Sequence, residues 1–105
     1  MKRNKEQSQI TLETVVQRDP EQEFSLIDDE VVMLSLKTGK YYTLNSVGSR
    51  IWQLLEKQTT IKDIIKQLVQ EYEIEKNKCI YDTISIIEDL VNRSLVIIKR
   101  NDKTL

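Results

Sequence analysis

The side chains that most often carry out catalysis are scarce in this chain of 105 residues, which has no histidine and a single cysteine, Cys79. A Ser-His or Cys-His nucleophile pair is therefore excluded, and so is a zinc site of the usual kind. Carboxylates cluster at positions 28–30 and 71–75. No pocket signature accompanies them, so we interpret them as turn and surface charges. Gly39 and Gly48 are isolated and form no phosphate-binding loop. We predict a protein that is not an enzyme and needs no cofactor or metal.

A different chemistry, recognition through backbone hydrogen bonds, is indicated by the middle of the chain. Residues 31–36 and 40–44 have the apolar, β-branched and aromatic character of strands, and Thr38-Gly39 between them is a turn dipeptide. Asn45 then occupies the position of a helix N-cap. A hairpin that runs directly into a helix leaves its last strand with a free edge, and such an edge can capture an extended peptide. We predict that residues 40–44 form this edge.

The elements around this edge follow from local patterns. Asp19-Pro20 ends a first strand, because proline restricts its own backbone and that of the residue before it. Thr60 is the expected N-cap of the second helix and Asn77 that of the third. The first 44 residues are β-rich, with three strands as the simplest count, and most of the remainder is helical. The expected segments are strands at 11–18, 24–26 and the two hairpin arms, helices at 46–56, 61–72 and 78–93, and a final strand or extended piece at 95–98.

Composition places the chain among small single-domain proteins. It is 39% hydrophobic and 31% charged, and its 16 basic and 17 acidic side chains leave a net charge of -1, which argues against nucleic acid as the main partner. One cysteine allows no internal disulfide, and neither a membrane-spanning segment nor a secretion signal is present in the sequence, so we predict a cytoplasmic protein with no membrane partner. We expect one domain over residues 11–98, with flexible segments at 1–10 and 99–105.

The third predicted helix has two apolar stripes when it is drawn at 100° per residue. One stripe is expected to face the core, and it consists of Ile80, Ile84, Ile87 and Val91. The other consists of Cys79, Thr83, Ile86 and Leu90. Two interpretations of the second stripe stay open: the helix packs in a corner against two other elements, or the stripe forms one wall of a groove whose other wall is the strand at 40–44. Which of Tyr41 and Tyr42 faces that groove depends on the hairpin register and also stays open.

These motifs together resemble the PqqD-like family over about residues 28 to 98. The resemblance is carried by the spacing Tyr42-x-Leu44-Asn45-x-x-Gly48-x-x-Ile51-Trp52, by the apolar stripe of the second helix, and by Asp82 with Leu90 and Leu95. Members of this family are peptide-recognition elements of pathways that make ribosomally synthesised, post-translationally modified peptides (RiPPs). The Lys-Thr-Gly-Lys-Tyr-Tyr hairpin is more similar to the stand-alone leader-binding proteins of lasso peptide clusters than to members that serve pyrroloquinoline quinone biosynthesis.

The resemblance implies a fold, a function and a set of partners. The fold is α+β, a three-stranded antiparallel sheet followed by three helices in a winged-helix-like arrangement. The function is binding of the leader segment of a precursor peptide, which adds as a further strand between the third strand and the third helix. The partners are the precursor, a leader peptidase and an ATP-dependent macrocyclase, or another RiPP modifying enzyme. The implied peptide-binding positions are Leu34, Lys40, Tyr41, Tyr42, Thr43 and Leu44 on the hairpin, and Cys79, Asp82, Thr83, Ile86 and Leu90 on the helix.

Two alternatives belong to other functional classes. A winged-helix DNA-binding protein has a similar order of elements, but its recognition helix would here carry Asp82, Glu88 and Asp89 against only Lys78 and Arg93, which repels phosphates. A small structural subunit that pairs with its own copy through the strand edge is the other alternative. Edge pairing is also compatible with leader binding, so we expect a monomer or a weak homodimer.

Overall fold

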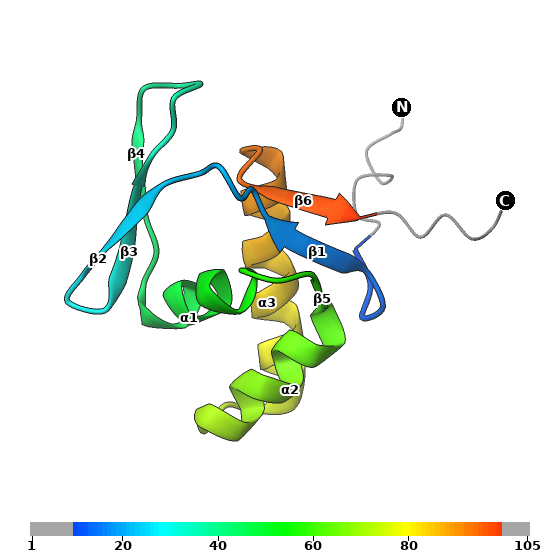
Figure 1. Ribbon diagram of the computed structural model, residues 1–105. Helices are drawn as coiled ribbons and strands as arrows, with labels where there is room; N and C mark the ends of the chain where they lie inside the picture. Colours follow the sequence, from blue (N-terminus) through cyan, green and yellow to red (C-terminus); the bar gives the residue numbers. More distant parts are fainter. Residues whose placement is uncertain (1–9, 100–105) are drawn as a thin grey trace, which may run out of the picture.

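A computed structural model describes residues 10–99, in which two small antiparallel sheets pack with three helices (Figure 1). The expected α+β fold with three helices is confirmed, and the expected three-stranded antiparallel sheet is one of the two sheets. In chain order the elements are β1 (Val15–Arg18), β2 (Phe24–Ile27), β3 (Glu30–Leu34), β4 (Tyr41–Thr43), α1 (Ser46–Leu54), β5 (Thr59–Thr60), α2 (Ile61–Glu71), α3 (Lys76–Asn92) and β6 (Val96–Lys99). The end segments expected to be flexible lie outside the described residues, except that Ile10 is buried and Lys99 ends β6.

The first strand belongs to a sheet of its own. β1 pairs with β5 on one side and with β6 on the other, whereas the hairpin sheet has the order β2-β3-β4. Four strands rather than three therefore precede the first helix. The chain changes direction at Asp19-Pro20, where the Gln22 amide donates to the Asp19 carbonyl over 3.1 Å. The amide of Arg18 donates to the Leu55 carbonyl over 2.9 Å, which ties β1 to the end of α1 instead of to β2.

The hairpin passes into α1 through the N-cap expected at Asn45. Its side chain accepts a hydrogen bond of 2.9 Å from the Gly48 amide, and this satisfies a donor in the open first turn of the helix. A Cβ on Gly48 would lie 3.3 Å from both the Asn45 side-chain oxygen and the Leu44 Cβ. The glycine therefore lets the helix start directly against the end of β4. This close junction holds β4 in a fixed position relative to the helices.

The predicted start of α2 is correct, whereas the predicted start of α3 is not. Thr60 caps α2 by accepting from the Asp63 amide over 3.1 Å, as expected. α3 begins two residues earlier than expected, at Lys76, and its N-cap is Glu75, whose carboxylate accepts from the Lys78 amide over 2.9 Å. The expectation of an Asn77 cap was wrong, because the carboxylate at position 75 caps the helix two residues earlier and interacts favourably with its positive end.

Trp52 of α1 lies in the core and contacts residues of both sheets. Its side chain is fully buried, and the Phe24 ring of β2 meets it edge-on with 5.8 Å between ring centroids. The guanidinium of Arg18 in β1 lies 4.7 Å from the Phe24 ring and 5.3 Å from the Trp52 ring, and it donates to the Trp52 carbonyl over 2.9 Å. The two sheets are thus held to α1 through one aromatic cluster. None of the helices in the described part of the chain is long and apolar enough to span a membrane.

Candidate functional site

The open side of β4 presents a short row of backbone donors and acceptors. The amide of Ser35 donates to the Lys40 carbonyl over 2.9 Å, and the amide of Leu44 donates to the Val31 carbonyl over 3.0 Å. Backbone groups alternate in direction along an antiparallel strand, so those of Tyr42 also point toward β3. Those of Tyr41 and Thr43 point the other way, and within residues 10–99 no further strand pairs with β4 on that side. The predicted free edge is therefore present.

The hairpin register decides which tyrosine faces inward. Tyr42 lies opposite Met33, which is buried, so the Tyr42 ring is on the inner face of the sheet. Tyr41 lies opposite Leu34 on the outer face and is 69% exposed. Leu34 is on the middle strand, and Tyr41 separates it from the open edge. Of the remaining positions implied on the hairpin, Lys40 and Thr43 are exposed and Leu44 is half-buried.

Tyr42 connects the hairpin to the C-terminal end of α3. The guanidinium of Arg93 stacks over its ring with 4.4 Å to the centroid, and the Thr38 hydroxyl lies 3.5 Å from its hydroxyl. The nearby Thr38 hydroxyl and, second, the Arg93 cation hold the pKa of Tyr42 below its ordinary value. Arg93 caps the end of α3 and is paired with Asp89 over 3.0 Å. This cation was not among the expected binding positions.

Two side chains of α3 lie on the same side of the helix as Arg93, which contacts Tyr42 of β4. Asp82, Ile86 and Arg93 are separated by four and seven residues, which places them within about 40° of one another around the helix axis. Ile86 is half-buried against the core, and Asp82 is half-buried and paired with Lys78 over 2.8 Å. The candidate site therefore consists of the open edge of β4 and an α3 face that carries one apolar and two charged side chains. The spacing of Arg93 from Asp82 and Ile86 is the signal that would have identified it from sequence.

Three positions implied on α3 lie in the core instead. Cys79, Thr83 and Leu90 are 2%, 1% and 2% exposed, and the Cys79 sulfur lies 3.9 Å from the Thr83 hydroxyl oxygen. The expectation that their side chains line an open groove is corrected, because α3 packs against α2, α1 and β6 together and buries this line of the helix. Ile87 is buried as expected of the other stripe, whose remaining members, Ile80, Ile84 and Val91, are only partly buried.

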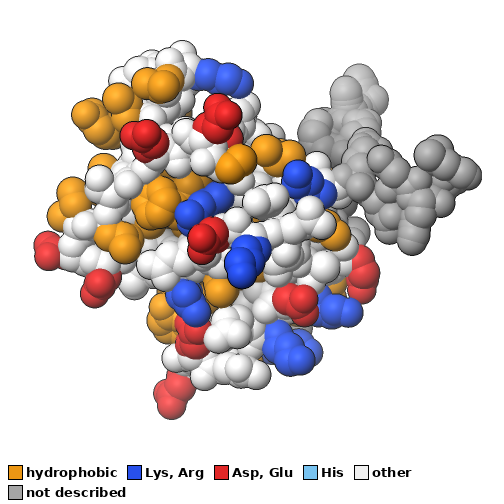
Figure 2. Space-filling view, viewed as in Figure 1, with side chains coloured by type: hydrophobic (Ala, Val, Ile, Leu, Met, Phe, Trp, Pro, Cys, Tyr) orange, Lys and Arg blue, Asp and Glu red, His pale blue; other side chains and the backbone are white. Residues whose placement is uncertain are grey.

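The outer face of the hairpin sheet carries exposed hydrophobic side chains. Figure 2 shows them gathered over the region that β2, β3 and β4 occupy in Figure 1. On this face Leu36 is 90% exposed and Ile27 57%. Leu26 is 50% exposed but lies opposite the buried Val31, on the inner face. Tyr41 belongs to the outer face as well as to the open edge of β4. An apolar surface is thus continuous with the candidate site. Within residues 10–99 no group of three or more histidine, cysteine, aspartate or glutamate side chains is placed to hold a metal ion.

Comparison with known proteins identifies the family to which this geometry belongs. The family model for PqqD, described as coenzyme PQQ synthesis protein D, matches residues 30–96, which is more than half of the chain. The fold is similar to that of TbiB1 in complex with the TbiA(beta) leader peptide, with a TM-score of 0.71 and 33% identity, covering 81% of this chain and 99% of that chain. It is also similar to a lasso peptide synthetase B1 complexed with the leader peptide, with a TM-score of 0.68 and 24% identity, covering 78% and 96%. No curated protein matches. The resemblance drawn from the sequence is confirmed, and the chain belongs to the PqqD family.

Proposed function

We propose that this protein binds the leader segment of a ribosomally made precursor peptide as an added strand on β4, beside α3. The observation that carries the proposal is the orientation of Tyr41 and Thr43, whose backbone groups face away from β3 in a strand whose Tyr42 contacts Arg93 at the end of α3. Solved relatives were obtained with leader peptides bound, which supports a peptide ligand for this chain. We further propose that the leader belongs to a lasso peptide precursor and that binding takes place in the cytoplasm.

Backbone pairing supplies affinity that depends little on the leader sequence. Two edge residues offer two amides and two carbonyls, and each hydrogen bond in such a ladder contributes about 0.5 to 1.5 kcal/mol net. A short ladder alone therefore gives weak binding, since a dissociation constant of 1 μM requires about 8 kcal/mol. Side chains of the leader have to supply the remainder by burying apolar surface.

Side-chain contacts select the leader. Alternate residues of an added strand point to opposite faces, so every second leader side chain is directed toward the inner face, where Tyr42 and Ile86 lie. Apolar leader residues fit there, because Ile86 is half-buried and uncharged. Asp82 and Arg93 flank this position with opposite charges, and they favour a leader that carries a complementary polar group at each end of the apolar contact.

The protein acts on the leader without catalysis and serves as an adaptor. Because the leader lies on one edge of the sheet, the outer face with Leu34, Leu36 and Tyr41 stays accessible after binding. An accessible apolar face next to the bound leader suits docking of a leader peptidase, a macrocyclase or another modifying enzyme. The expected state of the free protein is a monomer or a weak homodimer, and neither nucleic acid nor membrane takes part.

A titration with a labelled synthetic leader tests the proposal. The probe is the fluorescein-labelled TbiA(beta) leader peptide, with which the relative TbiB1 was solved, and its anisotropy is followed at low and at raised salt with duplex DNA as the control. Saturable leader binding that persists at raised salt, with no DNA binding, is the expected result. A leader that does not bind, or DNA binding that weakens steeply with salt, would overturn the adaptor proposal in favour of a winged-helix regulator.

Single N-methylation along the leader tests the mode of binding with the protein unchanged. Each N-methyl group removes one amide donor from the peptide. In an added strand, methylation weakens binding at every second residue of the paired segment, while the residues between them tolerate it. An even loss along the segment, or no loss at any residue, would rule out strand addition even if the leader binds.

A further inference from the structure

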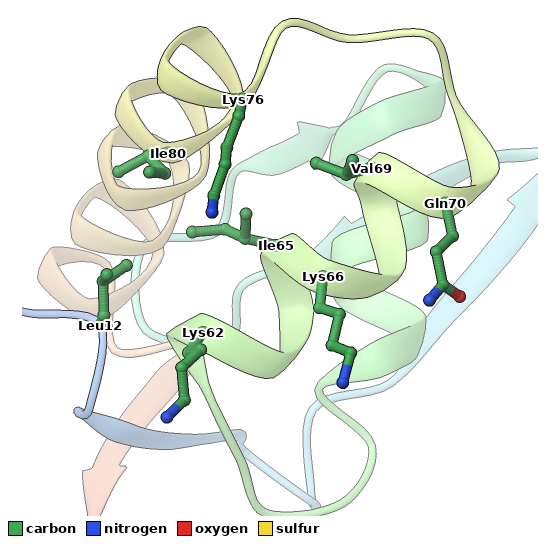
Figure 3. Close-up of a pocket in the computed structure, with 8 residues that line it drawn as sticks. All are labelled: Leu12, Lys62, Ile65, Lys66, Val69, Gln70, Lys76 and Ile80. Atoms are coloured by element: carbon green, nitrogen blue, oxygen red, sulfur yellow. The ribbon is translucent and has the colours of Figure 1, made fainter.

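A second apolar surface lies on another side of α3, where the helix meets α2 and the segment before β1. Leu12, Ile65, Val69 and Ile80 line a groove there with a volume of about 490 Å³. Figure 3 shows the side chains of Leu12, Ile65 and Val69 gathered between the two helices, with Lys76 extending toward Ile65. Hydrogen bonds hold residues 12–14 against the start of α2, because the Lys62 amide donates to the Leu12 carbonyl over 2.9 Å and the Ile61 amide to the Thr14 carbonyl over 3.1 Å. Val69 is 37% exposed. The groove takes no part in the candidate leader site.

The charged residues that line the groove are all lysines. Lys62, Lys66 and Lys76 line it, no carboxylate does, and these three ammonium groups form no ion pair within residues 10–99. Lys62 and Lys66 are four residues apart on α2, where two like charges repel each other. Lys62 and Lys76 also lie in the first turns of α2 and α3, where the helix dipole disfavours a cation. The border of the groove therefore carries three positive charges, and these suit an anionic partner.

We propose that this groove docks an acidic amphipathic helix of a partner protein. Both walls are helices whose backbone groups are already paired, so no strand edge is available and a peptide has to bind through its side chains. A helix suits this, because the ridge of side chains along it packs into the groove between two others. Leucine-type residues on one face cover Ile65 and Val69, and flanking carboxylates meet the lysines.

Repulsion between positive charges argues against two occupants that this chain could supply, its own residues 1–9 and a second copy of the groove. The segment of residues 1–9 is polar and carries Lys2, Arg3 and Lys5 against a single acid, Glu6, so the lysine border repels it. Two copies that meet groove to groove would bring six lysines together. The proposed partner is therefore a separate acidic protein. The inference goes beyond leader binding and does not depend on it.

Chemical-shift mapping of the full chain tests this proposal. The probe is a synthetic helical peptide of about 18 residues with Leu on one face and Glu beside it. A matched peptide with Lys in place of Glu is the control. We expect saturable shifts of residues 62–70 and 76–80 with the acidic peptide and none with the basic one. Lys66→Glu should weaken binding of the acidic peptide at least tenfold. Lys57→Glu, at an exposed lysine that does not line the groove, should leave it unchanged.

The remaining outcomes separate the other occupants. Binding of the acidic peptide that Val69→Asp does not weaken would overturn the apolar part of the proposal. Absence of saturable shifts, or equal binding of both peptides, would overturn the proposal that the groove docks an acidic helix. Displacement of the peptide by a fatty acid at lower concentration would assign the groove to a small amphiphile, and concentration-dependent self-association through residues 62–80 would assign it to a second copy. Leader binding is measured on the same samples, so failure here is distinguishable from failure of the proposed function.

Discussion

Thr43→Pro should abolish most of the leader affinity while the hairpin stays folded. The Thr43 amide points away from β3, so proline removes an edge donor without breaking a bond of the β3-β4 ladder. The loss consists of one hydrogen bond, about 1 kcal/mol, and an unpaired carbonyl on the bound leader, about 1 to 3 kcal/mol. A total loss of about 2 to 4 kcal/mol in binding free energy raises the dissociation constant roughly 30-fold to 800-fold.

Fluorescence anisotropy with the labelled leader measures this loss, and circular dichroism with thermal melting checks the fold. Thr43→Val is the matched control, because it keeps the amide and nearly the same side-chain shape, and its affinity should stay within a few-fold of the original. Tyr42→Pro is the opposite control, since the Tyr42 amide points toward β3 and its loss should destabilise the hairpin. A folded Thr43→Pro protein that binds the leader as tightly as the original chain would refute pairing at this edge.

Three further predictions concern single side chains. Ile86→Asp should abolish leader binding because it places a charge in the apolar contact, and its thermal unfolding should stay cooperative with a lower Tm, as measured by differential scanning calorimetry. Arg50 donates two hydrogen bonds to Glu71 and holds the pKa of that carboxyl to about 2. The pKa is lowered by folding, so the pair stabilises the protein above about pH 5, and that stability is lost as the pH falls toward 2. In urea titrations Glu71→Gln should remove this pH dependence and cost about 1 kcal/mol or less near pH 7, since both side chains are partly exposed. Cys79 is buried, so an aromatic disulfide reagent should modify it slowly in the folded chain and quickly in urea; rapid modification without denaturant would contradict this.

The parts of the fold that depend on local sequence were predictable. The turn at Thr38-Gly39 and the caps at Asn45 and Thr60 are set by residues within a few positions of each other, and all three appear in the structure. The partner of β1 was not predictable in this way. β5 consists of only Thr59–Thr60 and shows no strand pattern of its own, so its pairing with β1 arises from tertiary contacts.

The rotation of α3 about its axis was the main error in the predicted site. A helical wheel shows that the apolar arc is wide, but it does not show where three neighbouring elements will meet it. Thr83 was one of the implied peptide-binding positions, yet it is buried, with its hydroxyl near the Cys79 sulfur. Arg93 lay beyond the apolar stripes, and although its spacing from Ile86 places it on the same side of α3, its contact with Tyr42 is a tertiary one. The edge of β4 was predictable because it follows from strand order, whereas the facing helix surface depends on packing.

Amide hydrogen exchange of Tyr41 and Thr43, measured with and without the leader, tests the central claim most directly. Both amides face away from β3 in the free chain, so they should exchange rapidly, and an added strand should slow their exchange markedly. The β2 edge, where the backbone groups of Leu26 face outward, is the internal control and should not change. Slowed exchange at Tyr41 and Thr43 alone is the predicted result. Protection at Leu26 instead, or none at either edge while the leader is bound, would contradict binding along β4.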